Sequence, residues 1–413
     1  MSILLYNIFL FLYSIGLRLV SPWNEKARLW LKGRKQFPVF MGTEKTIWMH
    51  CASLGEFEQG RPLLEEMKKK YPSYKIALSF FSPSGYEVSK NYPGADYIFY
   101  LPMDNILHAK RLIASLDPAL VLWVKYEYWY YYLAELKKRN IPVILVSGIF
   151  RKNQPFFKWY GEIWKKMLGC FDQLFVQDEA SVALLESIAV KKNVLIGGDT
   201  RFDRVIAIAE KNEPVDHISS FIGNSRVLVA GSTWEEDDIE LLHFVKTRPD
   251  IKFIIAPHVV FKEKLADIKE AFSNAIFYSA VADDNSLLNK ANVLIIDNVG
   301  MLAKLYKYAD IAYVGGGFGT EGIHNVLEAA VYGKPVVFGP VYHKFAEASG
   351  LIDCGGAYSV TDPLELDRLL TKLFNDSALV NKSGNAARNY VLENKGATKK
   401  ILDHIEGKRL LTI

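Results

Sequence analysis

The stretch Trp48–Met67, "WMHCASLGEFEQGRPLLEEM", places a carboxylate where a buried strand gives way to a helix. Ser53, Gly55 and Glu56 lie between the apolar run and the helix-forming residues. A carboxylate in the first helical turn can cap free backbone N–H groups. It can equally take the proton of a hydroxyl that attacks a substrate. The helix start lowers the pKa of such a carboxyl and desolvation raises it, so the residue pattern leaves both roles open for Glu56.

A glycine-rich segment, "DIAYVGGGFGTEGIHNVLEAAVYGKPVVFGP", is the densest motif in the chain. A predicted strand runs into Gly316 and Gly317, and the spacing predicts a helix over 325–332. Glycines let the backbone approach a ligand closely, and the free N–H groups of a helix start favour a phosphate. The helix begins with Asn325, Val326 and Leu327, so we expect a nucleotide phosphate here. Glu328, about one turn in, can accept from both hydroxyls of a ribose, or can be only a favourable first-turn charge.

Residues 317–322, "GFGTEG", also match the G-x-G-x-x-G fingerprint of dinucleotide-binding domains. That fingerprint normally opens a nucleotide-binding half and is followed about 20 residues later by an acidic residue. Here it comes late in the second half, and the next predicted strand ends in "VVFGPVY" without an acid at its tip. The pattern therefore argues against a dehydrogenase.

Two further segments carry phosphate-binding residue types. In "AGSTWEEDD", Ser232 and Thr233 can donate to a phosphate at a helix start, or they can form an ordinary N-cap. In "GGDTRFDR", Arg201 follows a strand at a turn and can reach an anionic ligand, or it can be a surface arginine beside Asp203. In "LWVKYEYW", Lys125 and Glu127 stand two apart, and we expect them to share one face of an extended strand and to form a pair.

Short apolar runs bounded by turn residues alternate with helical stretches along most of the chain. This pattern is typical of parallel sheets covered by helices on both faces. The series occurs twice, so we predict an α/β protein of two doubly wound Rossmann-like domains facing a cleft. The predicted parts are an anchor and basic segment at 1–35, a domain at 36–205, a linker at 206–224, a domain at 225–376, and terminal helices at 377–413 that can pack back on the first domain.

The N-terminus, "MSILLYNIFLFLYSIGLRLV", is an apolar run slightly shorter than the roughly 20 residues of a straight membrane span. Basic residues interleaved with Trp23 and Trp30 follow it. Such a segment is typical of the cytoplasmic, interfacial side of a membrane anchor. The alternative is a buried first helix followed by a solvated basic turn.

Composition limits the classes of function. The 413 residues carry a net charge of only +4, so nothing here points to nucleic acid. The three cysteines are far apart, which favours neither a zinc site nor a disulfide framework. We find no acidic cluster with the spacing of a metal site and expect neither a metal nor a cofactor.

The segment "GGGFGTEGIHNVLEAAVYGKPVVFGP" resembles the donor-nucleotide segment of GT-B glycosyltransferases. Together with "SLGE", "DPALVLWVKYEYW", "GGDTRFD", "GSTWEED" and the N-terminal anchor, it resembles the transferases that move 3-deoxy-D-manno-octulosonate (Kdo) in lipopolysaccharide synthesis. The resemblance runs over nearly the whole chain. It implies a GT-B fold, CMP-Kdo as donor and a lipid A precursor as acceptor. It also implies that the enzyme acts at the cytoplasmic face of the inner membrane.

The resemblance also implies roles for individual residues. Glu56 matches the general base and Arg201 a basic residue that steadies charge in the transition state. Glu127 matches a second acid, whereas Lys125 stands where relatives usually carry an acid. Further donor contacts are implied at Pro257, His258, Val299, Gly300 and Met301. The chain lacks the arginine of the family's Pro-Arg-His-Pro motif. Two other hypotheses are a GT-B transferase that uses a UDP-sugar and a lipid acceptor, and a non-catalytic membrane protein that binds a nucleotide sugar.

Overall fold

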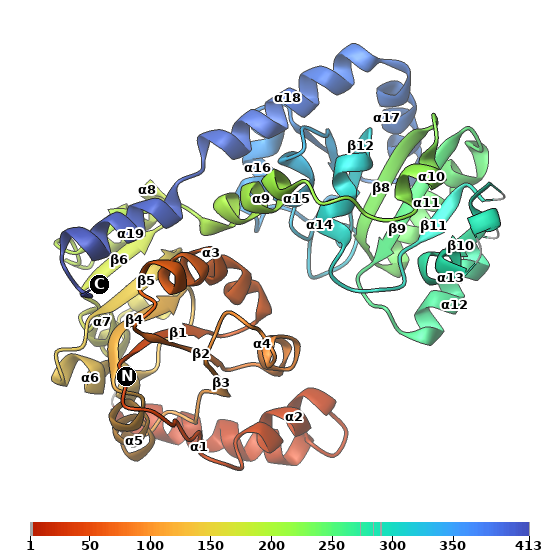
Figure 1. Cartoon of the computed structure of the whole chain (residues 1–413). Coiled ribbons are helices and arrows are strands. Elements are labelled where there is room, and N and C mark those ends of the chain that lie inside the picture. The colour runs from red at the N-terminus through yellow and green to blue at the C-terminus, as the bar shows by residue number, and fades with distance from the viewer. Residues whose placement is uncertain (1–2, 273, 284, 290, 413) are drawn as a thin grey trace. The chain divides into compact units, whose positions relative to one another are not determined.

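The computed structural model describes residues 3–272, 274–283, 285–289 and 291–412, and divides into two compact units. Unit 1 comprises residues 1–204 and 395–413, and unit 2 comprises residues 205–394 (Figure 1). The residues predicted as a linker, 206–224, include the end of helix α9 (Thr200–Lys211) and helix α10 (Ile218–Ile222).

Unit 1 is built on a parallel sheet of seven strands, counted over the described residues, in the order β3-β2-β1-β4-β5-β6-β7. The strands are β1 (Thr46–Cys51), β2 (Lys75–Phe80), β3 (Tyr97–Tyr100), β4 (Pro118–Val124), β5 (Val143–Gly148), β6 (Gln173–Val176) and β7 (Val194–Ile196). The helices are α1 (Ile3–Val20), α2 (Glu25–Gly33), α3 (Leu54–Lys70), α4 (Pro83–Ser89), α5 (Ile106–Leu116), α6 (Tyr130–Lys138), α7 (Glu162–Leu168), α8 (Glu179–Glu186) and α19 (Ala397–Gly407).

Every residue of β1 is buried, as expected for a strand covered on both faces. Because side chains alternate along a strand, β1 divides between two cores. Trp48 belongs to one hydrophobic cluster, while Ile47 and Met49 belong to the other. Helix α19 adds Ile401 and Ile405 to the second cluster, which α3 also enters. The carboxylate of Asp203 accepts from the backbone N of Gly396 and of Thr398 at 2.6 and 2.7 Å, which fixes the start of α19 on unit 1.

Unit 2 is built on a second parallel sheet of seven strands, again over the described residues, in the order β10-β11-β9-β8-β12-β13-β14. The strands are β8 (Arg226–Thr233), β9 (Ile251–Pro257), β10 (Ala275–Phe277), β11 (Val293–Ile295), β12 (Ile311–Val314), β13 (Val336–Phe338) and β14 (Ala357–Ser359). The helices are α10, α11 (Glu235–Thr247), α12 (Lys262–Ala271), α13 (Tyr278–Asp283), α14 (Leu302–Leu305), α15 (Leu327–Ala330), α16 (Ala346–Asp353), α17 (Pro363–Asn375) and α18 (Ser377–Glu393).

In unit 1 the strand order reverses between β1 and β4. In unit 2 it reverses between β8 and β12, and also near one edge of the sheet, where β11 lies between β10 and β9. Helices lie on both faces of such a sheet, and the connections on its two sides diverge where the order reverses. The predicted α/β class with two doubly wound domains is therefore confirmed. Ligands of open parallel sheets bind beyond the carboxyl ends of the strands at such a reversal, so the reversals at β1–β4 and β8–β12 are where functional residues should be sought.

Candidate functional site

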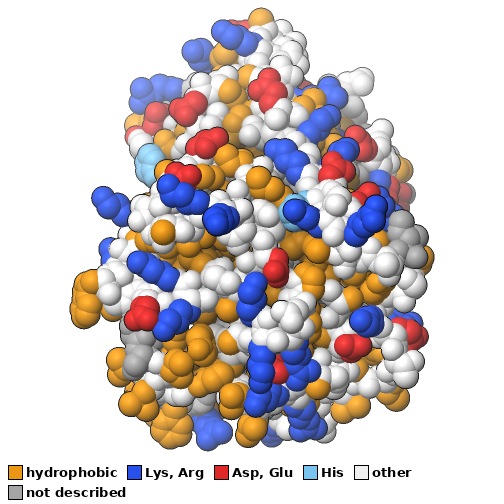
Figure 2. Space-filling model, turned by 90° about the vertical axis from the view of Figure 1, so that its left-hand side faces the viewer, with side chains coloured by type: hydrophobic (Ala, Val, Ile, Leu, Met, Phe, Trp, Pro, Cys, Tyr) orange, Lys and Arg blue, Asp and Glu red, His pale blue; other side chains and the backbone are white. Residues whose placement is uncertain are grey.

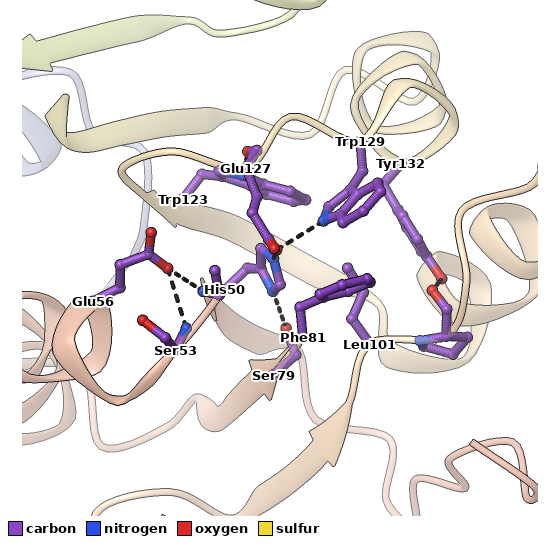
Figure 3. A network of polar contacts seen from close by, with 12 residues as sticks. His50, Ser53, Glu56, Ser79, Phe81, Leu101, Trp123, Glu127, Trp129 and Tyr132 are labelled. Atoms are coloured by element: carbon purple, nitrogen blue, oxygen red, sulfur yellow. Dashed lines mark hydrogen bonds and ion pairs between the residues drawn. The ribbon is translucent and has the colours of Figure 1, made fainter. Parts of the chain in front are cut away.

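Glu56 lies just beyond the end of β1, at the strand reversal of unit 1. It is the third residue of α3, and its side chain reaches back toward the chain before the helix. Glu56 Oε2 accepts from the backbone N of Ser53 at 3.2 Å and also from the backbone N of Ala52 (Figure 3). The carboxylate therefore does cap the helix start, as one of its two predicted roles requires.

The same carboxylate is only 6% exposed, and burial decides its basicity. Burial and the charge of Glu127 raise the pKa of Glu56 to about 7, against the opposing effect of the Ala52 and Tyr126 backbone N–H groups and of Lys125. Desolvation therefore has a larger effect on the pKa of Glu56 than the N–H groups of the helix start. A carboxyl with a pKa near the working pH is suited to general-base chemistry, because it is ionised in part yet still basic. Capping and proton transfer are therefore compatible in one side chain.

Glu127, beyond the end of β4, is held by a chain of buried polar groups. Its Oε2 lies 3.2 Å from His50 Nε2 and accepts from Trp129 Nε1 at 3.1 Å (Figure 3). On the other side of the ring, His50 Nδ1 lies 2.9 Å from Ser79 Oγ, which itself accepts from Trp48 Nε1 at 2.8 Å. Indole can only donate, so every group is satisfied when Ser79 donates to Nδ1 and His50 donates from Nε2 to Glu127. This network fixes the carboxylate that raises the pKa of Glu56.

Lys125 does not share an extended strand with Glu127, and that prediction is wrong. Strand β4 ends at Val124, and Lys125 has a φ of 56°, in the left-handed region. The chain turns there, so the alternation of side chains along a strand no longer applies. The charge of Lys125 instead lowers the pKa of Glu56 and of Asp199.

Arg201 lies in the first turn of α9 and is paired with Asp199. Its Nε and Nη2 donate to Asp199 Oδ2 at 2.9 and 2.7 Å. Burial raises the pKa of Asp199, but the charges of Arg201 and Lys125 outweigh it and hold that pKa below its usual value. Asp199 also accepts from Gln59 Nε2 at 2.8 Å, so α3 and α9 together orient the guanidinium. The alternative of a surface arginine beside Asp203 is wrong, because Asp203 binds the start of α19 instead.

Ser232 and Thr233 end β8, at the strand reversal of unit 2. The N-cap of α11 is Trp234, whose backbone N donates to Asp237 Oδ2 at 2.9 Å. The alternative that Ser232 or Thr233 caps this helix is therefore wrong. Ser232 has a φ of 55°, which marks a sharp turn directly after the strand. The buried Asp237 also accepts from Gly316 N at 2.8 Å, and so joins this turn to the glycine-rich loop.

The glycine-rich loop after β12 packs directly on neighbouring backbone. A Cβ on Gly317 would lie 2.5 Å from the backbone N of Gly339, and Gly316 has a φ of 90°. The helix predicted over 325–332 is shorter, since α15 covers only Leu327–Ala330. Glu328 Oε1 accepts from Asn325 Nδ2 at 3.1 Å. Val326 and Leu327 are buried, so they position the loop rather than face solvent.

Three rings form a stack beside this loop. The His258 and His324 ring centroids are 4.3 Å apart, and that of Trp234 is 4.7 Å from His258. His258 follows Pro257 at the end of β9, and its backbone N donates to Thr233 O at 2.9 Å. Burial lowers the pKa of His258, and burial with the nearby His258 charge lowers that of His324 to about 4. Near neutral pH the stack is therefore a flat, uncharged surface.

Val299 and Gly300 form an exposed turn ahead of α14, and the half-buried Met301 is the N-cap of that helix. Val299 is 86% exposed and Gly300 has a φ of 100°. Within the described residues, no group of three or more His, Cys, Asp or Glu side chains could hold a metal ion.

Sequence reasoning missed the residues that support this chemistry. His50 and Ser79 in unit 1, and Asp237 and His324 in unit 2, connect segments far apart in the chain, whereas Trp129 donates to Glu127 two residues away. One signal was readable: His50 is a polar residue inside an otherwise apolar strand. Its partners depend on how the strands lie side by side, which local spacing does not encode.

Comparison with known proteins bears directly on this arrangement. Residues 23–204 match the family model of 3-deoxy-D-manno-octulosonic-acid transferase (kdotransferase). The chain is 26% identical to the 3-deoxy-D-manno-octulosonic acid transferase of Haemophilus influenzae, over 86% of each chain. It is 28% identical to that of Aquifex aeolicus, over 80% of this chain and 86% of the relative. It is also 31% identical to a bifunctional glycosyltransferase/methyltransferase of Fusobacterium nucleatum over 81% of this chain, but it spans only about half of that relative (53%).

Solved structures agree on the fold. The UDP-GlcNAc 2-epimerase of Neisseria meningitidis superposes with a TM-score of 0.62 at 18% identity, covering 88% of this chain and all of the other. MurG of Acinetobacter baumannii superposes with a TM-score of 0.56 at 14% identity, covering 88% of this chain and 99% of the other. The predicted GT-B architecture is confirmed. The chain is a glycosyltransferase of GT-B fold, and its residues 23–204 match the family model of the Kdo transferases.

Proposed function

We propose that this chain transfers Kdo from CMP-Kdo to a hydroxyl group of a lipid A precursor, with inversion at the anomeric carbon. The observation that carries the proposal is Glu56, a buried carboxyl at the strand reversal with a pKa raised to about 7. The names of the Haemophilus and Aquifex relatives support the sugar that is transferred.

In the proposed reaction Glu56 takes the proton of the acceptor hydroxyl. The hydroxyl oxygen then forms a bond to the anomeric carbon of Kdo, and the bond from that carbon to the CMP phosphate oxygen breaks. CMP leaves with the bonding electron pair. Glu127 keeps Glu56 basic through its charge, and Lys125 limits that effect. We assign Arg201, oriented by Asp199, to the charge that develops on the departing phosphate.

We propose that unit 2 binds the CMP-sugar. The backbone of Gly316 and Gly317 and the turn at Ser232 and Thr233 are suited to a phosphate, because close backbone approach presents N–H groups to an anion. We assign Glu328, with Asn325, Val326 and Leu327, to the ribose, and Pro257, His258 and Val299–Met301 to the base. A monophosphate carries less charge than a diphosphate, so N–H groups and an arginine suffice without a metal ion.

We also propose that α1 holds the enzyme on the cytoplasmic face of the inner membrane by lying in the interface. Within the described residues, α1 is long and apolar enough to cross a membrane, and most of its apolar side chains are exposed. It is nevertheless bound to unit 1 near its start, where Tyr6 Oη donates to the buried Asp104 at 2.6 Å and Tyr131 Oη donates to Asn7 Oδ1 at 3.0 Å. It is bound further along by Tyr13, whose ring contacts Trp30 and Phe81. A perpendicular span would break these contacts, whereas an in-plane helix keeps them.

The test is a turnover assay with a tetraacyl lipid A precursor as acceptor and CMP-Kdo or UDP-sugars as donor. We expect transfer with CMP-Kdo alone. Transfer from a UDP-sugar instead would establish the second hypothesis, a different GT-B transferase. Binding of CMP-Kdo without transfer by the wild-type protein would establish the non-catalytic one.

A further inference from the structure

A cavity of about 550 Å³ lies in unit 1, where α1 and α2 meet the segment after β3 and helix α5. We call it the α1–α2 pocket. Its volume lies within the range of roughly 300–1,000 Å³ typical of small-molecule sites. Its lining includes side chains that can bind an anion: Arg18, Trp30, Arg34, Lys35, His108 and Arg111. The proposed transfer chemistry uses none of them.

The lining of the pocket carries four cationic side chains and no carboxylate. Arg34 is the most buried of the four. Its Nε donates to Leu101 O at 2.8 Å and its Nη2 to Phe81 O at 2.7 Å, and its guanidinium lies over the Trp30 ring. Burial lowers the pKa of Arg34 to about 9, so it remains charged near neutral pH. Arg18 and Lys35 form no ion pair within the described residues. A cluster of cations whose lining contains no carboxylate attracts an anion.

A donor without an acceptor lies in the same lining. Trp30 is 6% exposed, and its Nε1–H has no hydrogen-bond partner in the described part of the chain. An unsatisfied buried N–H destabilises the folded state, so such a group usually marks a missing partner. An anionic oxygen in the pocket would supply the acceptor as well as the counter-charge.

The surroundings identify the kind of anion. Ser14 and Arg18, one helical turn apart on α1, both line the pocket, while Leu12 and Leu19 on the same helix are 59% and 66% exposed. In the lower part of Figure 2, at the height of α1, α2 and α5 in Figure 1, hydrophobic side chains lie next to Lys and Arg side chains. An apolar surface beside a cationic pocket matches a molecule with acyl chains and a phosphate.

We propose that the α1–α2 pocket binds the headgroup phosphate of an anionic bilayer phospholipid, whose acyl chains lie along the exposed side of α1. The charges of Arg18, Arg34, Lys35 and Arg111 surround the phosphate, and Trp30 donates to it. Bulk phospholipid thereby seats the enzyme in the membrane at a defined depth. This inference needs only the membrane contact and does not depend on the transfer reaction.

Native mass spectrometry of the full chain in neutral detergent tests this site, because a micelle has no charged surface to mask a specific contact. Phosphatidylglycerol and phosphatidylcholine are the probes, added separately. We expect one phosphatidylglycerol retained per chain and phosphatidylcholine lost. The double variant Lys35→Gln/Arg111→Gln should bind at least about tenfold more weakly, because it removes two charge-assisted contacts.

The matched control is Lys32→Gln/Lys110→Gln, which removes two exposed charges close in sequence to Lys35 and Arg111 but outside the lining of the pocket. It should retain the lipid as the wild type does. Lys35→Gln alone, at an exposed side chain, provides a milder variant if the double variant unfolds. Equal loss in both double variants would overturn the proposal. Retention of the tetraacyl lipid A precursor but not of phosphatidylglycerol would also overturn it, since the pocket would then serve the acceptor.

Discussion

Replacing Glu56 by Gln should slow transfer strongly and make the protein more stable at alkaline pH. Burial raises the pKa of Glu56 from 4.5 to about 7. At 1.36 kcal/mol per pH unit, the ionised carboxylate costs the folded state about 3 kcal/mol. Because the pKa is raised on folding, this cost is absent below pH 4.5, grows between pH 4.5 and 7, and is complete above pH 7. Gln keeps the shape and the carbonyl acceptor but cannot ionise.

The assay compares urea unfolding of wild type and Glu56→Gln at pH 5 and pH 8. The variant should gain up to about 3 kcal/mol at pH 8 and less than about 1 kcal/mol at pH 5. In parallel, loss of the base should lower kcat by roughly 10²–10⁴-fold. The matched control is Glu58→Gln on the same helix, whose side chain is 40% exposed and pairs with Arg61 and Arg204. A gain in stability that is the same at both pH values, or a kcat equal to that of the control, would refute the reasoning.

Three further predictions follow from the contacts described. Glu127→Gln should shift the acidic limb of the kcat–pH profile to lower pH, because the charge of Glu127 raises the pKa of Glu56; an unmoved limb would contradict the coupling. Gly317→Ala should lower stability by about 1–3 kcal/mol in thermal unfolding, since its Cβ would lie 2.5 Å from backbone. Gly319→Ala, with its nearest atom at 3.7 Å, is the control and should unfold as the wild type does. Tyr6→Phe removes a 2.6 Å hydrogen bond to a buried carboxylate and should cost about 1–3 kcal/mol; limited trypsin digestion should cut the segment after α1 faster, and an unchanged rate would argue against docking of α1.

The fold class could be predicted from the sequence because apolar runs and turn residues are local signals of strands and of their ends. The fully buried β1, with Glu56 just beyond it, is visible in "TIWMHCASLGE" without any tertiary information. The glycine-rich loop could be predicted for the same reason. Gly316 adopts a positive φ and Gly317 packs directly on backbone, and both are positions that a residue with a Cβ would strain.

Predictions that required a partner elsewhere in the chain failed or stayed open. The prediction that Lys125 lies on a strand is wrong because no residue near it in the sequence indicates that β4 ends at Val124. Arg201 pairs with Asp199, two residues before it, and the equally near Asp203 is bound by residues almost 200 positions away, which local spacing does not show. The basicity of Glu56 depends on its burial and on Glu127, and neither is a property of the residues around it in sequence.

The most direct test of the central claim is mass spectrometry of the lipid after incubation of the full-length protein with CMP-Kdo and a tetraacyl lipid A precursor. We predict a product heavier by one or more Kdo residues with the wild-type protein, and unchanged precursor with Glu56→Gln over the same time. Unchanged precursor with the wild type would contradict the assignment as a Kdo transferase. Product formed by Glu56→Gln at the wild-type rate would contradict Glu56 as the base.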